Sequence, residues 1–155
     1  MIYYEVKATY VKDAGDGKMK STKEVYLVRA LNYADAESRM VETLSHYSHE
    51  GMPEVEIKKV KYVDIFDSEI VTDVQIYKAK VVYTSLEGEG DNLKEKKVSV
   101  LMLVRAANIK GALQRLEKNL SGTASDYFIH TISETLIMDY YDFSVADVAA
   151  QPAEV

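Results

Sequence analysis

Residues 27–44 read LVRALNYADAESRMVETL, and residues 103–120 read LVRAANIKGALQRLEKNL. Eight of the eighteen aligned positions are identical, including the whole LVRA stretch and the asparagine that follows it by two residues. Ordinary composition gives roughly one or two matches by chance over such a length. An internal repeat determines the fold more strongly than any single motif, so we expect two copies of one structural unit.

The similarity continues on both sides of this segment. YYEVKATY (3–10) aligns with IYKAKVVY (76–83), and EVEIKKVKYVDIFD (54–67) aligns with DYFIHTISETLIMD (126–139). Each half therefore reads as strand, strand, helix, strand. We predict an α+β fold with internal duplication of a ββαβ unit, in which two helices pack on a mostly antiparallel sheet and a pseudo-twofold axis relates the halves. The single domain, 1–143, comprises repeats 1–72 and 73–143 and precedes a flexible tail, 144–155; one continuous sheet and two sheets are both open.

Side-chain periodicity supports each of these elements. Apolar and polar residues alternate in 3–10 and 76–83, which places one face of each strand in a core. The second strands, 24–30 and 98–106, are apolar on both faces and are expected in the centre of a sheet or covered on both sides. Both helical segments carry one-sided apolar stripes: Tyr33, Ala36, Met40, Leu44 and Tyr47 in the first, and Ile109, Ala112, Leu113, Leu116 and Leu120 in the second.

Asparagine precedes both helical segments, at Asn32 and Asn108. Its side-chain oxygen accepts a hydrogen bond from a free backbone N–H in the first turn of a helix. We therefore predict that both asparagines are structural N-caps rather than ligand contacts.

The third strands share an irregular apolar pattern. Ile57 is followed by Val60, and Ile129 by Ile132, so that apolar residues lie three apart instead of two. This spacing predicts a bulge or bend at the same place in both halves.

The composition limits the classes of function. The 155-residue chain has a formal net charge of -6 and no cysteine. The charge disfavours double-stranded DNA or an anionic membrane as the main partner, although it leaves room for a local basic strip. The lack of cysteine removes disulfides, thiolate catalysis and cysteine-based zinc sites. MIYYEVKATYVKD is not a signal sequence and no apolar run approaches the roughly 20 residues of a membrane helix, so we predict a cytoplasmic protein with no membrane partner.

No motif for catalysis or metal binding stands out. His46 and His49 have a spacing that can hold a metal ion, but the second half has no equivalent, and a solvated helix end is the simpler interpretation. The acidic residues at strand ends, which could bind a divalent ion or act in acid–base chemistry, are interpreted as solvated or paired with arginine: Asp64, Asp67, Glu69, Asp139 and Asp142. We predict no metal, no cofactor and no catalytic residue, and we favour a protein that is not an enzyme.

Tyrosine supplies twelve of the fifteen aromatic residues. In the first strands, Tyr10 and Tyr83 lie close in sequence to Lys7 and Lys80. Aromatic side chains and lysines on one sheet face hold single-stranded nucleic acid in several modules. The alternative is that the tyrosines are half-buried in the sheet and the lysines between them are solvated.

Arg29 and Arg105 occupy equivalent positions at the ends of the second strands. If a pseudo-twofold axis relates the halves, both guanidinium groups could face one shared site and bind a carboxylate or phosphate in bidentate fashion. Alternatively, each arginine pairs within its own half with a carboxylate such as Asp67 or Asp139. We favour the structural pairing.

The order of these segments resembles an uncharacterised domain-of-unknown-function family of Bacteroidetes-type bacteria and their phages. The resemblance covers roughly residues 2–141 and is carried mostly by GTxxDYxI, from Gly122 to Ile129, and SETxIMD, from Ser133 to Asp139. It implies no activity and no site residues. A phage or mobile-element origin would favour replication accessories, host-defence antagonists and assembly factors.

We therefore expect a small non-enzymatic binding or assembly protein of unknown ligand. The alternatives are a single-stranded nucleic-acid-binding accessory protein and a protein that sequesters a small nucleotide-like molecule. A homo-oligomer or a protein partner is expected because the apolar second strands must be covered. The candidate ligand-binding residues are Arg29, Arg105, Lys7, Lys80, Tyr10 and Tyr83.

Overall fold

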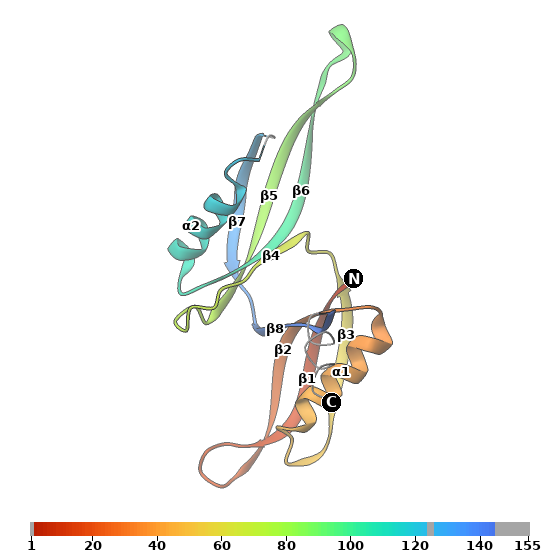
Figure 1. The fold of residues 1–155 in the computed structure, drawn as a ribbon, viewed down its shortest axis with the longest axis vertical. Coiled ribbons are helices and arrows are strands. Elements are labelled where there is room, and N and C mark those ends of the chain that lie inside the picture. The colour runs from red at the N-terminus through yellow and green to blue at the C-terminus, as the bar shows by residue number, and fades with distance from the viewer. Residues whose placement is uncertain (1, 124–125, 145–155) are drawn as a thin grey trace, which may run out of the picture. The chain divides into compact units, whose positions relative to one another are not determined.

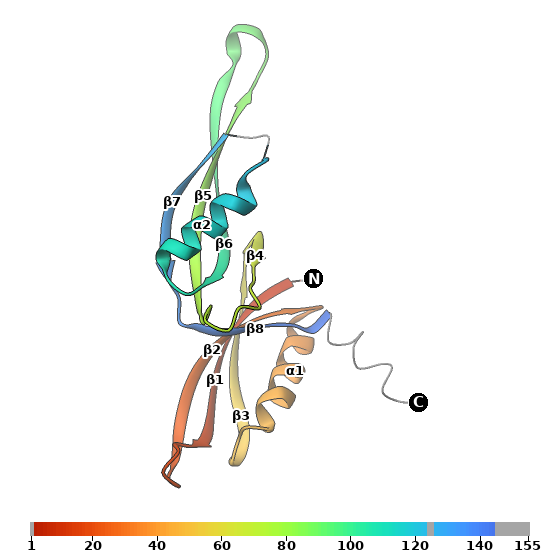
Figure 2. The ribbon, with the colours of Figure 1, turned by 60° about the vertical axis from the view of Figure 1, so that its left-hand side comes forward.

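The computed structural model describes residues 2–123 and 126–144. The predicted tail therefore lies outside the described residues, except for Ser144. The chain divides into two compact units, the first built from residues 2–60 and 136–144 and the second from residues 61–135. Each unit is a sheet with one helix against it (Figures 1 and 2).

The first unit contains β1 (Ile2–Asp13), β2 (Met19–Ala30), α1 (Tyr33–Ser45), β3 (Glu50–Val60) and β8 (Ile137–Asp142). Its strands lie in the order β3-β1-β2-β8. β1 is antiparallel to both β2 and β3, whereas β8 is parallel to β2. α1 covers one face of this sheet (Figure 1), and we call the opposite face its outer face.

The second unit contains β4 (Asp64–Phe66), β5 (Gln75–Glu87), β6 (Lys94–Ala106), α2 (Ile109–Leu120), β7 (Asp126–Glu134) and the short 3-10 helix η1 (Gly90–Asn92). Its strands lie in the order β4-β6-β5-β7, with β4 parallel to β6 and the other pairs antiparallel. β5 and β6 pair as far as Glu87 and Lys94, but β7 pairs with β5 only up to Thr84. The hairpin therefore continues past β7 as a two-stranded ribbon (Figure 2).

Each sheet is completed by a strand from the other half of the sequence. β4 follows the first helix and third strand along the chain but pairs with β6, and β8 follows the second helix but pairs with β2. The segments 54–67 and 126–139, each read from sequence as one strand, are instead broken at 61–63 and 135–136. The α+β class is confirmed, and the strands form two mostly antiparallel sheets.

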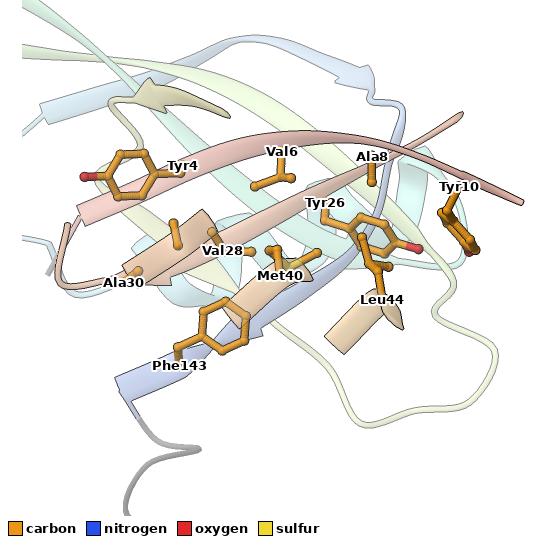
Figure 3. Close-up of a cluster of buried hydrophobic side chains, with 11 residues drawn as sticks. Tyr4, Val6, Ala8, Tyr10, Tyr26, Val28, Ala30, Met40, Leu44 and Phe143 are labelled. Atoms are coloured by element: carbon orange, nitrogen blue, oxygen red, sulfur yellow. The ribbon is translucent and has the colours of Figure 1, made fainter. Parts of the chain in front are cut away.

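The second strands, β2 and β6, are central in their sheets, as their apolar sequences predict. On the helix face of the first unit, Met40 and Leu44 of α1 pack against Val6 and Val28 (Figure 3). Fully burying a side chain of this size contributes about 1.5–3 kcal/mol. The predicted helical stripes are buried only in part: Ala36, Met40, Leu44, Ala112, Leu116 and Leu120 are buried, whereas Tyr33, Tyr47, Ile109 and Leu113 are exposed.

Both predicted N-caps are confirmed. The Asn32 side chain accepts a hydrogen bond from the Asp35 backbone N–H at 2.8 Å, and the Asn108 side chain accepts one from the Gly111 N–H at 2.8 Å. These bonds explain why asparagine stands at this point in both halves, because they stabilise the first turn of each helix.

The predicted bulge is present in β7 but absent from the equivalent part of β3. Ile129 pairs with Val81 and Thr131 with Lys80, so His130 is an extra residue in β7. In β3 the pairing with β1 is regular from Glu54 to Val60, and its irregularity lies nearer the start of the strand, between Glu50 and Glu54. The spacing of Ile57 and Val60 instead reflects the end of β3, where the chain leaves the sheet.

Candidate functional site

The two faces of β5 differ sharply in character. Tyr77, Ala79 and Val81 point to α2 and belong to the buried core of the second unit. Successive side chains in a strand point to opposite faces, so Lys78 and Lys80 lie on the outer face. Lys78 is exposed and Lys80 is half-buried. The sequence of β5 thus places its lysines on the face that α2 leaves uncovered.

Neighbouring strands add further side chains to this outer face. Lys97 of β6 is paired with Thr84, and Phe128 of β7 is paired with Val82, two residues from Lys80. Phe128 is 45% exposed, although Val82 between these strands is buried. Neighbouring strands lie about 5 Å apart and side chains two residues apart on one face about 7 Å. By these spacings the Phe128 backbone lies about 8 Å from that of Lys80, and about 12–14 Å from those of Lys97 and Lys78, so Lys80 is the lysine nearest the exposed ring.

The bulge in β7 brings a second ring to this face. The bulge residues His130 and Thr131 stand opposite the single residue Lys80, and the His130 side chain is exposed. The His130 ring meets the Phe128 ring edge to face, with 6.3 Å between their centroids and 74° between their planes. We call the set Lys78, Lys80, Lys97, Phe128 and His130 the lysine–aromatic face.

The lysines of this face have no acidic partner in the described parts of the chain. None of Lys78, Lys80 and Lys97 forms an ion pair with residues 2–123 or 126–144. Two carboxylates border the face: Asp126, in register with Thr84, and Glu95, in register with Leu86 and two residues from Lys97 on the same side of β6. The three ammonium groups are thus available to an anionic ligand.

The net charge of the chain is distributed unevenly between the units. Residues 61–135 contain ten lysines and arginines against eleven aspartates and glutamates, whereas the rest of the chain contains nine against fourteen. The second unit is therefore nearly neutral. An anion that approaches its lysine cluster meets little repulsion from the net charge of that unit.

The sequence profile of a family described as a domain of unknown function, DUF4494, matches residues 2–143. The chain belongs to the DUF4494 family. No curated protein and no solved structure is significantly similar to it. The match spans both units of the domain, so the strands exchanged between the two halves lie within it.

The outer face of the first unit in this DUF4494 domain differs from the lysine–aromatic face. It carries a groove of about 720 Å³. Lys7, which the sequence analysis selected, lines this groove beside Lys23, but the paired strand β3 contributes Glu54 and Glu56. Val25, Leu136 and Met138 complete its apolar part. A groove with charges of both signs does not favour a polyanion.

Tyr10 does not share a face with Lys7. It points to the helix side of β1, where it is buried and donates a hydrogen bond to Glu24 at 2.9 Å. Tyr26 donates a second hydrogen bond to the same carboxylate, and the Lys12 ammonium lies 2.8 Å from its other oxygen. Tyr10 thus belongs to a buried polar cluster of the DUF4494 core.

The cluster sets the ionisation of its members. Burial opposes ionisation of Glu24, but the hydrogen bonds from Lys12, Tyr26 and Tyr10 outweigh it, so the pKa of Glu24 lies below its ordinary value. Burial, followed by the hydrogen bond to Glu24, raises the pKa of Tyr10 and of Tyr26. Glu24 is therefore held as a carboxylate, with both phenols protonated.

Tyr83 lies on the helix side of β5, on the face opposite Lys80. Its ring is 6.2 Å from that of Tyr127, and burial raises the pKa of its hydroxyl. Of the predicted lysine and tyrosine candidates, only Lys80 therefore lies on the lysine–aromatic face. Strand alternation places Tyr10 and Tyr83 on the sheet faces opposite to Lys7 and Lys80, so the tyrosines and the lysines do not share one surface.

Arg29 and Arg105 each pair with a carboxylate in their own unit. Arg105 Nε donates to Asp67 Oδ1 at 2.6 Å, and Arg29 Nη1 lies 3.6 Å from Asp142 Oδ2. We expected each arginine to pair within its own half of the sequence, Arg29 with a carboxylate such as Asp67 and Arg105 with one such as Asp139. The partners instead come from the other half, because β4 pairs with β6 and β8 pairs with β2. The Arg29 guanidinium also lies over the Tyr3 ring, 5.9 Å from its centroid.

The other sequence candidates have local structural roles or remain in solvent. His46 ends α1, and His49 donates its backbone N–H to Val11; both side chains are exposed. In residues 2–123 and 126–144, no three histidine, aspartate or glutamate side chains gather as a metal site requires. No helix in these ranges is long and apolar enough to span a membrane.

Sequence reasoning missed Lys97, Phe128 and His130. A signal for Phe128 was present, since it alternates with the apolar residues Tyr127 and Ile129 and must therefore point to the other face. The predicted bulge after Ile129 was the signal for His130. What was missing was the identity of the neighbouring strand, which places these rings beside the lysines of β5.

Proposed function

We propose that this DUF4494 protein is a small, non-enzymatic binding protein for ligands that carry phosphate groups. The observation that carries the proposal is the lysine–aromatic face, where three lysines with no ion pair to the described residues share a sheet face with an exposed aromatic ring. Phosphate is the common chemistry of the two ligand classes that the sequence favours as alternatives, nucleic acid and nucleotide-like molecules.

Geometry supports contact with more than one phosphate. Lys78 and Lys80 are two residues apart on β5, which separates their backbones by about 7 Å. Lys97 lies on β6, beyond Thr84. Lysine binds phosphate as a flexible point charge. Ammonium groups spread over two strands suit a chain of phosphates better than one isolated anion.

A polyanion without bases tests this function. The full chain is titrated with labelled inorganic polyphosphate at about 50 mM salt, alongside the variant Lys78→Gln/Lys80→Gln/Lys97→Gln. The salt dependence is measured as the slope of log K against the logarithm of the salt concentration. Loss of about three lysine–phosphate contacts makes this slope shallower by roughly two. We expect clear binding by the unmodified chain and loss of most of it in the variant.

The matched control removes the same charge from the first unit, as Lys7→Gln/Lys23→Gln/Lys58→Gln. This variant should bind polyphosphate like the unmodified chain, because its lysines lie on the outer face that also carries Glu54 and Glu56. Equal losses in the two triple variants, or no binding by the unmodified chain, would reject the proposed function.

We also propose that the two units descend from one ancestral ββαββ unit by duplication. The matching strand orders, the two asparagine caps and the two arginine–aspartate pairs support this origin. The pairing register further aligns DIFD (64–67) with DYYD (139–142). The pseudo-twofold relation, a homo-oligomer, a cytoplasmic location and a Bacteroidetes or phage source stay predictions.

A further inference from the structure

Resting on the proposed function, we infer that the phosphate-bearing ligand is a single-stranded nucleic acid, one of whose bases stacks on Phe128. The lysines account only for attraction to an anion. The exposed aromatic pair at the same place suits a ligand with a flat apolar surface next to its charges. Single strands offer unstacked bases attached to a regular line of phosphates.

The position of Phe128 is unusual for a structural aromatic residue. It lies on the outer face of the edge strand β7, 45% exposed, whereas Tyr127 and Ile129 on either side pack against the core. Core packing therefore does not account for its ring. Ring stacking on an exposed aromatic side chain is tolerant of base identity, because every base has a π-face.

His130 adds a second aromatic ring to the stacking surface of Phe128. Its ring lies 6.3 Å from the Phe128 ring, centroid to centroid, at 74° to it. The bulge is what brings His130 to this face, since a regular strand would leave one residue fewer between Ile129 and Ile132. A base stacked on Phe128 would thus have a second exposed aromatic ring close by, adding contact area without sequence reading.

The lysines then lie along the path of the backbone. β5 is the strand next to β7, so Lys80 is one strand spacing from His130, and Lys78 lies two residues farther along β5, in register with Ser133. Lys97 of β6 is the pairing partner of Thr84, which lies four residues from Lys80 along β5. A strand whose base rests on Phe128 can place neighbouring phosphates near these ammonium groups. The face spans more than a single nucleotide, which favours an oligonucleotide over a mononucleotide.

A duplex does not offer an unstacked base to Phe128. Its bases are stacked on one another and present only their edges in the grooves. A duplex could instead approach the β5–β6 ribbon, where Lys94 and Lys96 lie, because a two-stranded ribbon fits a major groove. The comparison of single-stranded with duplex ligand therefore separates stacking from simple charge attraction.

The test measures fluorescence anisotropy of the full chain with a labelled single-stranded 12-mer of mixed sequence at about 50 mM salt. The same sequence as a duplex and a labelled mononucleotide are the two comparison ligands. We expect the 12-mer to bind at least about tenfold more tightly than either. Phe128→Ala should weaken 12-mer binding by about tenfold, and Phe128→Tyr should restore it.

Two controls keep the result interpretable. Tyr47→Ala removes an exposed aromatic residue from the first unit and should leave binding unchanged. The melting temperature of Phe128→Ala should match that of the unmodified chain, because much of the ring is already in solvent. Polyphosphate binding should also be the same in Phe128→Ala, since it involves no base.

The outcomes separate this inference from the proposed function. If polyphosphate binds through the three lysines but the 12-mer binds no better than the duplex or the mononucleotide, the ligand class is wrong and the binding function stands. An unchanged 12-mer affinity in Phe128→Ala would also overturn the inference. If neither polyphosphate nor the 12-mer binds, the proposed function itself fails.

Discussion

Arg105 and Asp67 join the end of β6 to the end of β4 through a hydrogen bond of 2.6 Å between Arg105 Nε and Asp67 Oδ1. β4 is only three residues long, and it comes from the opposite half of the sequence. The pair thus fixes a short strand that backbone pairing alone would hold weakly. Arg29 and Asp142 stand at the corresponding point of the first unit, at 3.6 Å.

These two pairs should differ in their contribution to stability. The Arg105 side chain is 12% exposed, whereas that of Arg29 is 39% exposed. We expect Arg105→Ala to lower the free energy of unfolding by about 2 kcal/mol, as loss of a charge-assisted hydrogen bond does. Arg29→Ala should cost about 0.5 kcal/mol, in the range of exposed ion pairs. Urea unfolding of both variants measures the difference, and equal losses would contradict this interpretation.

Glu24 should make the stability of the protein depend on pH in the acid range. Because the folded-state pKa of Glu24 lies below its ordinary value of 4.5, the unfolded chain binds its proton more readily. The contribution of Glu24 is therefore complete above about pH 4.5 and is lost as the pH falls through the folded-state pKa. Urea midpoints between pH 7 and pH 3 should fall more steeply in the unmodified chain than in Glu24→Gln.

The control for this pH dependence is Glu56→Gln, an exposed carboxylate on the outer face. Its acid-range profile should follow that of the unmodified chain. At pH 7, Glu24→Gln should be less stable by about 2 kcal/mol, because Lys12 and the two tyrosines lose a charged partner. If the urea midpoints of Glu24→Gln and of the unmodified chain change with pH in the same way, the Glu24 carboxylate does not stabilise the folded protein through these contacts.

The bulge in β7 should tolerate loss of its extra residue. Deletion of His130 leaves Ile129 opposite Val81 and Thr131 opposite Lys80, which is regular antiparallel pairing. We therefore expect this deletion variant to unfold cooperatively, with a melting temperature within a few degrees of the unmodified chain. Circular dichroism during heating tests this expectation.

Deletion of Ile57 is the matched comparison, because β3 pairs regularly with β1 around it. Removing one residue from a regular strand sends every side chain on one side of the deletion to the other face. Val55 would leave the core or the strand would have to slip, so this variant should lose its cooperative transition. A similar response to both deletions would mean that the bulge assignment is wrong.

Local signals predicted much of the fold. Asn32 and Asn108 were identified as caps because a cap depends on residues only three apart. The buried positions of α1 and α2 followed from helical periodicity, but Tyr33 and Ile109 at the helix starts are exposed, although the Tyr33 ring contacts that of Tyr4 edge to face. Arg105 was expected to pair with a carboxylate of its own half of the sequence, such as Asp139, but it pairs with Asp67 because β4 joins β6 from the other half.

The candidate site was predicted only in part. Lys80 was selected for a sheet face shared with aromatic residues, but these were sought on its own strand, at Tyr83, which alternation places on the opposite face. Phe128 reaches Lys80 through pairing between β5 and β7, which lie about fifty residues apart in the sequence. A strand's own sequence shows which side chains share a face, but it does not show which strand lies next to it.

The sequence by itself determined the two helices, their caps, the central position of the second strands and the alternation that divides each strand into two faces. All of these depend on residues close together in the chain. The tertiary structure alone decided that β4 and β8 join the sheet of the opposite half, and that Phe128 and His130 lie beside the lysines of β5. The physical reason is that strand pairing joins segments far apart in the chain, and the backbone edges of different strands offer the same hydrogen-bonding groups. Capping and side-chain periodicity, in contrast, depend only on residues within a single helix or strand.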